Sequence, residues 1–321
     1  MINKRVSIII PHYNRIDLIR YTLDSVLTHK QGGVDLEIIV VDDASKNEVV
    51  CELKELCSSV RLILNEKNQG APACRNQGLN LATGDFVLFL DSDDLIAPDF
   101  FVEKIIFLQK NSECNGVYGP WEYFESDHEF AENHIRPRHS RYPLYPMTKA
   151  DSIICNLLQG WFIPINAVVW RTAAVKKAGG FTEGLIVNQD VDLVFKMLTN
   201  GVIAGIESPK ALIRIHQGER VGHGMSEKKL SQILQLRKAF VRLLSDQNKL
   251  TESHKEAVAS YIFNMWAKYR KEFPRVSSEM IQFSKLTYPK LKLKGTVGLQ
   301  LVAFLLGNER AIIIKQYLQQ P

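Results

Sequence analysis

The stretch FVLFLDSDDL, residues 86–95, joins a short apolar run to a cluster of carboxylates. Five apolar residues in a row predict a strand that is buried on both faces. Asp91, Asp93 and Asp94 follow this strand with only Ser92 between them, and carboxylates so close together repel unless a cation lies among them. Hard divalent cations such as Mg²⁺ and Mn²⁺ prefer oxygen ligands. The stretch therefore predicts a sheet with a cation site at its edge, although Asp93 or Asp94 could instead cap a helix that begins near residues 97–98.

Apolar strands alternate with helical patterns over the first hundred residues. We expect strands at residues 6–10, 36–41, 60–64 and 86–90, and helices at 17–27, 49–57 and 72–82, the last of them capped by Gly84. This alternation predicts right-handed βαβ units and a mostly parallel sheet, in which ligands bind beyond the carboxyl ends of the strands. Three of the four strands end in the polar sequences PHYN, DDAS and DSDD. Their shared position predicts a functional site at that edge.

The rest of the chain has a weaker pattern. Residues 116–145 are aromatic and irregular and are expected to form a surface excursion, whereas residues 161–170 have the composition of a strand. After Gly224, apolar spacing predicts helices over residues 230–244 and 258–269. We therefore expect two domains, residues 1–224 and a helical region of residues 225–321.

Composition narrows the classes of function. The net charge of +5 comes from 40 basic and 35 acidic residues without a dense basic run, so a nucleic-acid partner is not expected. Neither GxGxxG nor GxxxxGK[ST] occurs, which argues against a dinucleotide fingerprint and a P-loop. The five cysteines form no metal or disulfide pattern, and the apolar N-terminal run is too short for a signal sequence, so a cytoplasmic location is expected.

Three motifs together resemble the family 2 glycosyltransferases: VSIIIPHYNR (residues 6–15), IIVVDDAS (38–45) and NQGAPACRNQGLNLATGDFVLFLDSDD (68–94). Members of this family are inverting enzymes that use nucleotide-activated sugars. The resemblance implies an α/β GT-A fold, Rossmann-like with a mostly parallel central sheet, followed here by a helical C-terminal region. It also implies a Mn²⁺ or Mg²⁺ cofactor, a UDP-sugar donor, and a glycan or lipid-linked acceptor in surface polysaccharide synthesis at the inner face of the cell membrane.

The resemblance assigns roles to the matching residues. Those expected to bind the nucleotide-sugar are Pro11, Tyr13, Asn14, Asp43, Arg75, Asp91, Ser92, Asp93 and Asp94. Among them, Asp93 is implied as the main metal ligand, Asp91 as a ligand of the metal and the ribose, and Asp43 as the acceptor for the base. Asp42 is expected to support its loop, and His12 is given no chemistry because the family tolerates several residues there.

The second half of the chain is expected to supply the catalytic base. In AGGFTEGLIVNQDVDLVFKML (residues 178–198), Asp190 stands where the family has its base, but Gln189 replaces a common Glu. Asp192 is a rival base, and helix capping is the alternative for both aspartates. His216 resembles a residue that closes over the site and contacts the diphosphate or metal, although a loop histidine is commonly just solvated. Trp161 is expected either to form the floor of the acceptor site, where its ring would stack on a sugar, or to pack in the core.

Two further questions stay open in the sequence. The apolar residues 295–307 follow the basic run KLKLK and would either lie on an anionic membrane, or pack on the protein or at a dimer interface. A haloacid-dehalogenase-like phosphatase is a rival function, but its nucleophile strand comes early and carries Thr or Val where this chain has Leu95. A non-catalytic sugar-nucleotide or glycan-binding protein is the other rival, and the presence of both Asp93 and Asp190 argues against it.

Overall fold

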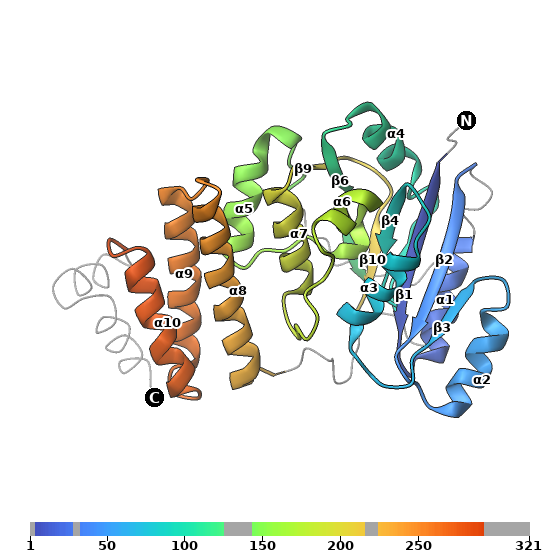
Figure 1. Ribbon diagram of the computed structural model, residues 1–321, viewed down its shortest axis with the longest axis horizontal. Coiled ribbons are helices and arrows are strands. Elements are labelled where there is room, and N and C mark those ends of the chain that lie inside the picture. Colours follow the sequence, from blue (N-terminus) through green and yellow to red (C-terminus); the bar gives the residue numbers. More distant parts are fainter. Residues whose placement is uncertain (1–3, 28–32, 125–142, 216–223, 292–321) are drawn as a thin grey trace. The chain divides into compact units, whose positions relative to one another are not determined.

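The computed structural model describes residues 4–27, 33–124, 143–215 and 224–291 (Figure 1). Contacts divide the chain into two compact units. The N-terminal unit comprises Met1–Ile154 and Trp161–Gly224, and the C-terminal unit comprises Cys155–Gly160 and Met225–Pro321. The predicted domains 1–224 and 225–321 stay a prediction, because compactness alone does not test whether each part folds independently.

A seven-stranded sheet forms the centre of the N-terminal unit. Its order is β3 (Arg61–Leu64), β2 (Asp35–Asp42), β1 (Arg5–His12), β4 (Phe86–Phe89), β8 (Val168–Arg171), β6 (Cys114–Tyr118) and β9 (Val202–Gly205). All neighbouring strands are parallel except β8, which runs antiparallel to β4 and to β6. The prediction of a mostly parallel central sheet is therefore confirmed.

Two strands near the middle of this sheet, β1 and β4, are almost completely buried. In β1, every residue from Val6 to His12 is buried, and in β4 all four residues are buried. A strand between two neighbours and covered on both faces loses water from both rows of side chains, which is why its sequence is continuously apolar rather than alternating. Full burial of one Ile or Val side chain contributes about 1.5–3 kcal/mol.

Helices connect the strands of the N-terminal unit. They are α1 (Ile16–Leu27), α2 (Asn47–Leu56), α3 (Ala71–Leu81), α4 (Val102–Lys110), α5 (Ala150–Leu158), α6 (Thr172–Lys177) and α7 (Gln189–Thr199), α5 extending into the C-terminal unit. Helix α3 packs on β1 and β2. A Cβ on Gly78 would lie 2.4 Å from Cγ2 of Ile9, so this glycine sets how closely α3 approaches the sheet.

The predicted cap of α3 by Gly84 is wrong. The helix ends at Leu81, and its C-terminal cap is Ala82 with extended backbone angles. Gly84 lies instead beside β1, where a Cβ would be 2.7 Å from the backbone nitrogen of Ser7. The glycine is therefore required by the close approach of two backbones and not by a left-handed helix end.

Two other expectations differ from the structure. The excursion over residues 116–145 was expected to be irregular, yet β6 and β7 (Trp121–Phe124) occupy its first part. The strand expected over residues 161–170 is shorter, because Pro164 is followed by a 3₁₀ turn, Ile165–Ala167, before β8 begins. Proline lacks the N–H that a central strand needs, which accounts for the late start.

A second sheet of three short strands adds to the N-terminal unit. Its order is β5 (Leu95–Ile96), β10 (Ala211–Arg214) and β7, with β10 antiparallel to β5 and parallel to β7. Because β5 directly follows the DSDD sequence, this sheet brings the end of β10 next to the acidic cluster.

Within residues 224–291, the described part of the C-terminal unit contains three packed helices, α8 (Glu227–Asp246), α9 (Glu252–Tyr269) and α10 (Pro274–Thr287), which run side by side in Figure 1. The helical character predicted for this region is confirmed, and α10 adds a helix that the apolar spacing did not single out. Arg237 of α8 is fully buried, where its guanidinium lies over the ring of Tyr261 and donates to the carbonyl of Leu157.

Within the described part of the chain, none of the helices combines the length and the apolar composition that crossing a bilayer requires. The apolar stretch 295–307, for which membrane contact or packing was expected, lies outside the described residues.

Candidate active site

The polar sequences that follow β1, β2 and β4 lie side by side at the carboxyl edge of the large sheet. The register pairs His12 with Asp42, the backbone N–H of Asp43 donates to the carbonyl of His12 at 2.8 Å, and Leu90 donates to Ile9 at 3.0 Å. Parallel strands end at one edge, so three loops distant in sequence meet there. The edge predicted from the sequence is the edge that the structure builds.

The acidic cluster consists of Asp91, Asp93 and Asp94. One carboxylate oxygen from each lies within 4.8 Å of the others. Each carboxylate nevertheless has a partner from the chain itself: Asp91 accepts from Arg75 at 2.5 Å, Asp93 forms an ion pair with Arg15, and Asp94 is bound by two donors described next. These pairs offset the mutual repulsion of the cluster.

Asp94 is the buried member of the cluster. Its two carboxylate oxygens accept from the side-chain amide of Asn166 at 2.7 Å and from the backbone N–H of Arg214 at 2.8 Å. Burial, together with the charge of Asp91, raises the pKa of Asp94 to about 8. Its partners come from the 3₁₀ turn and from β10, so Asp94 ties the DSDD loop to both and does not cap a helix.

Asp91 and Asp93 are the carboxylates with access to a ligand, since the side chain of Asp91 is 41% exposed and that of Asp93 is 13% exposed. They offer hard oxygen atoms at the end of a strand, and this is the donor set that Mg²⁺ and Mn²⁺ prefer. The residues present therefore fit a divalent metal held by Asp91 and Asp93. Ser92 lies buried between them.

His12 and Asp42 form a buried pair beneath the loops. Nδ1 of His12 lies 2.8 Å from Asp42, and Nε2 accepts the backbone N–H of Arg15 at 3.2 Å. A ring that accepts at Nε2 is neutral with its proton on Nδ1, so His12 donates to Asp42. Burial alone would raise the pKa of Asp42, but hydrogen bonds from His12 and Ser45 outweigh it, and the pKa is lowered.

Asp43 and Asn14 hold backbone groups of the neighbouring loops. The Asp43 carboxylate accepts from the backbone N–H groups of Gln69 and Gly70, both at 2.8 Å, and so fixes the turn into α3. Each carboxylate oxygen can accept a second hydrogen bond, which leaves capacity for a ligand. Asn14, with a φ of 52°, accepts from the backbone of Lys46.

Tyr13 and Pro11 provide the apolar part of this edge. Tyr13 is 49% exposed although it directly follows β1, whereas Pro11, two residues earlier within β1, is buried. An exposed aromatic ring at a strand end presents a face on which a planar group can stack.

Asp190 lies in the first turn of α7, beside the acidic cluster. Arg75 joins the two, because one nitrogen of its guanidinium donates to Asp91 and another donates to the side-chain oxygen of Gln189 at 2.7 Å. The backbone N–H of Ile165 donates to the Asp190 carboxylate. Burial raises the pKa of Asp190 to about 6, although the charge of Arg75 acts in the opposite direction.

A second hydrogen bond explains why position 189 carries Gln instead of Glu. Its Nε2 donates to the carbonyl of Leu185 at 2.8 Å while its Oε1 accepts from Arg75. A glutamate would accept from Arg75 but has no proton for Leu185. The preceding residue, Asn188, has a φ of 60°, so the turn into α7 is locally strained.

Asp192, the rival base, is buried and makes contacts that stabilise the structure. Its side chain is 4% exposed and pairs with Lys196 one turn later at 2.8 Å, while Thr182 donates its backbone N–H to the same carboxylate. These contacts hold the loop before α7 against the helix and direct Asp192 away from the acidic cluster.

The remaining expected residues are placed as follows. Trp161 is part-exposed, and its ring meets the ring of Tyr145 edge-on at 6.1 Å, so the two aromatic side chains form a small surface beyond β6 and β9. His216 lies outside the described residues.

Sequence reasoning missed four residues of this edge: Arg15, Asn166, Arg214, and His12, to which it gave no chemistry. Arg214 donates its Nε to the backbone carbonyl of Asp93 at 2.9 Å, in addition to its contact with Asp94. The available signals were weak. Arg214 ends an apolar run, and Arg15 directly follows PHYN, but neither pattern indicates which carboxylate the arginine will meet.

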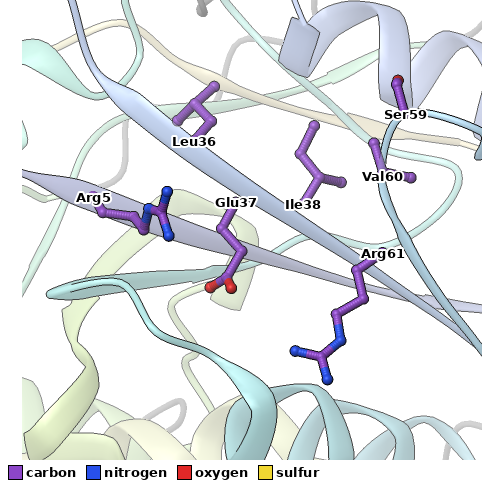
Figure 2. A pocket seen from close by; sticks show the side chains of 7 residues that line it. All are labelled: Arg5, Leu36, Glu37, Ile38, Ser59, Val60 and Arg61. Carbon is purple, nitrogen blue, oxygen red and sulfur yellow. The ribbon is translucent and has the colours of Figure 1, made fainter.

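A cavity of about 210 Å³ lies at the amino ends of β1, β2 and β3 (Figure 2). Its polar lining includes Arg5, Glu37 and Arg61. The Glu37 carboxylate is already bound by Ser7 and Thr83, and Arg5 pairs with Asp35. This cavity is at the sheet edge opposite the motif residues, and we do not assign the active site to it.

The fold defines an α/β protein with its polar motif residues at the carboxyl ends of parallel strands, and comparison with known sequences gives the family. Residues 7–174 match the model of Glycosyl transferase family 2, which is more than half of the chain. The chain belongs to this family, as its motifs predicted.

The alignments with individual relatives cover only part of each relative's length. An uncharacterized glycosyltransferase of Haemophilus influenzae is 30% identical over 60% of this chain and 62% of its own length. The UDP-Glc:alpha-D-GlcNAc-diphosphoundecaprenol beta-1,3-glucosyltransferase WfgD of Escherichia coli is 35% identical over 38% of this chain and 47% of that protein. Thus the chain spans less than two thirds of these relatives.

Among solved structures, S. aureus TarS residues 1–349 in complex with UDP-GlcNAc superposes with a TM-score of 0.68 at 19% identity. The alignment covers 98% of this chain and 92% of that one. At this identity the likeness concerns the fold, and it confirms the predicted GT-A architecture.

We predict that Asp42→Asn lowers the free energy of unfolding by about 1–3 kcal/mol at pH 7, because the new amide places a donor against the backbone N–H of Ser45. Since the folded pKa of Asp42 is lowered, its stabilisation is present above the unfolded pKa of roughly 4 and is lost as the pH falls through the folded value. Urea unfolding at pH 7 and pH 3 measures both effects.

The control is Asp35→Asn, at the exposed start of the same strand, which should change stability little. An equal loss for the two variants at pH 7, or a loss for Asp42→Asn that is undiminished at pH 3, would contradict the assigned role.

Proposed function

We propose that the chain transfers a sugar from a nucleotide-sugar, in particular a UDP-sugar, to a hydroxyl group of an acceptor, with inversion at the anomeric carbon. One observation carries the proposal: buried Arg75 bridges Asp91 of the acidic cluster and Gln189, the residue next to Asp190. A family 2 chain thus has its two sets of carboxylates fixed at one sheet edge. Donor and acceptor would be held next to each other there.

The donor side of the site would use the loops after β1, β2 and β4. The exposed ring of Tyr13 supplies a stacking face for the base, and Asp43 has acceptor capacity left for an N–H of a uracil. Asp91 and Asp93 would hold a divalent metal, which when bound supplies positive charge against the leaving diphosphate. The TarS structure with UDP-GlcNAc supports this type of donor through its shared fold.

Asp190 would act as the general base. Its carboxylate would accept the proton of the acceptor hydroxyl as that oxygen forms a bond to the anomeric carbon. The bond from this carbon to the diphosphate oxygen breaks on the opposite face, and the nucleoside diphosphate leaves with the bonding electrons. A pKa of about 6 suits the role, because the group is ionised near pH 7 yet more basic than an ordinary aspartate.

The acceptor side is supported by aromatic rings and by charge. Trp161 and Tyr145 provide flat faces of the kind that pack on sugar rings. Residues 225–321 hold 17 basic and 7 acidic residues, whereas residues 1–224 hold 23 and 28, so the excess positive charge lies in the C-terminal unit. A basic unit favours an anionic acceptor or surface.

We therefore extend the proposal to a lipid-linked or otherwise anionic glycan acceptor in surface polysaccharide synthesis, met at the cytoplasmic face of the membrane. The name of WfgD, which specifies a diphosphoundecaprenol-linked substrate for that enzyme, supports this class of acceptor.

A thermal-shift screen of nucleotide-sugars tests the donor and the metal. UDP-sugars with Mn²⁺ should raise the melting temperature by roughly 5–10 °C at a hundred times Kd, which corresponds to about 2.7 kcal/mol of linkage. Asp93→Asn should lose the metal-dependent part of the shift, whereas Asp85→Asn, at the opposite end of the sheet, should keep it. Identical shifts in EDTA and in Mn²⁺ would refute the metal, and indifference to all uridine nucleotides would refute the donor.

Asp190→Asn should lower the rate of transfer by roughly 10²–10⁴-fold, the usual contribution of a general base, because its amide cannot accept the proton. UDP affinity, measured by calorimetry, should stay within a few-fold of wild type. Asp192→Asn is the comparison: it removes the partner of Lys196 and should affect stability more than transfer by the folded protein. If Asp192→Asn, and not Asp190→Asn, abolished transfer, the base assignment would be wrong.

The pH dependence follows from the raised pKa of Asp190. The active form is the carboxylate, so kcat/KM should fall about ten-fold per pH unit below pH 6 and level off above pH 7. Residual transfer by Asp190→Asn should lack this acid limb. A wild-type profile that stays flat down to pH 5, with donor affinity unchanged, would argue against Asp190 as the titrating group.

A further inference from the structure

The carboxylate of Asp93 already has a cation beside it. A guanidinium nitrogen of Arg15, the residue just before α1, forms an ion pair with Oδ2 of Asp93. The position is notable because Asp93 is also the residue that a divalent metal would use under the proposed function. A guanidinium and a metal ion at one carboxylate compete for its negative charge, since two positive charges so close together repel.

Three arginines surround the acidic cluster, and they differ in exposure. Arg75 is 4% exposed and bound to both Asp91 and Gln189, and Arg214 is 7% exposed and bound to the DSDD loop. The side chain of Arg15 is 32% exposed. Of the three, Arg15 is therefore the one that reaches Asp93 from the solvent side.

The backbone of Arg15, by contrast, is fixed. Its N–H donates to Nε2 of His12, which is held in turn by Asp42, and its carbonyl accepts from Leu18 and Ile19, both at 3.1 Å, in the first turn of α1. The buried histidine therefore fixes the backbone from which the Arg15 side chain reaches Asp93. With this backbone fixed, a change of partner by Arg15 requires side-chain rotation alone.

We infer, on the basis of the proposed function, that Arg15 is a resident counter-ion that exchanges partners. Without donor, it neutralises Asp93 and keeps the acidic cluster together. A divalent ion arriving at Asp93 displaces it. The displaced guanidinium, still tethered at the start of α1, then binds the diphosphate of the donor, whose oxygens match its planar pair of donors.

This exchange links the metal to the nucleotide. The metal alone has to compete with Arg15, whereas the metal together with a diphosphate gives the displaced arginine a new partner. Binding of Mn²⁺ and of UDP is therefore mutually favourable. The exchange also leaves the empty site electrically balanced, because Arg15 neutralises Asp93 when no metal is bound.

Calorimetry with Mn²⁺ alone and with UDP at saturating Mn²⁺ tests the inference on the full chain. Arg15→Gln should bind Mn²⁺ alone about ten-fold more tightly than wild type, and should bind UDP about ten-fold more weakly. Arg15→Lys keeps the charge but not the paired donors, so its Mn²⁺ affinity should stay near wild type while its UDP affinity falls. Arg20→Gln, further along α1 and paired with Glu52, should match wild type in both titrations.

The outcomes separate this inference from the proposed function. If wild type binds UDP with Mn²⁺ but Arg15→Gln binds Mn²⁺ no more tightly, the exchange is overturned and the glycosyltransferase proposal stands. Unchanged UDP affinity in both Arg15 variants also overturns it. If wild type binds no nucleotide, the proposed donor fails first. Should Arg15→Gln not fold, the lysine variant decides through its UDP affinity.

Discussion

The organisation of the carboxyl edge depends on how three neighbouring carboxylates are neutralised. Asp91, Asp93 and Asp94 lie close enough to share one cation, and the protein supplies partners for each from a different element: Arg75 from α3, Arg15 from the start of α1, and the backbone of Arg214 from β10. Every one of these contacts is also a tertiary tether. Charge compensation and the positioning of the loop are therefore the same set of interactions.

Arg75 connects the acidic cluster to the helix that carries Asp190. It is buried, its guanidinium lies 5.2 Å from the ring centre of Phe181, and its donors are divided between Asp91 and Gln189. A buried cation with two partners resists displacement, since removing Asp91 would leave its charge without compensation and removing Gln189 would leave a buried donor without an acceptor. The acidic cluster and the helix that carries Asp190 are consequently held at a fixed separation, which is what in-line chemistry between a donor and an acceptor requires.

In the loops after β1 and β2, a neutral histidine is the hydrogen-bond partner of a buried carboxylate, Asp42. His12 is enclosed by the sheet, donates to Asp42 and accepts from Arg15, while Ser45 and Asn14 connect the two loops on the surface. Tyr13 and Asp43, which we propose bind the base, flank this network. Burial makes its hydrogen bonds cooperative and costly to break, so both residues are held in place although they lie in loops.

The sequence by itself determined the elements and the edge. Continuous apolar runs predicted β1, β2 and β4, and the polar sequences after them predicted where the site would be, because strand burial and turn chemistry are recorded in adjacent residues. The acidic cluster and Asp190 could be singled out for the same reason, as local motifs. Gly84 was misread because its requirement comes from Ser7, on another strand.

Only the tertiary structure decided which groups meet. Arg15 and Asp93 are separated by 78 residues, Arg75 and Gln189 by 114, and Arg214 and Asp94 by 120. No periodicity or spacing connects such positions, because a side-chain pair across a sheet edge depends on strand order, register and helix packing together. Exposure, the desolvation that raises the pKa of Asp190, and the difference between a buried Arg75 and a part-exposed Arg15 likewise exist only once the chain has folded.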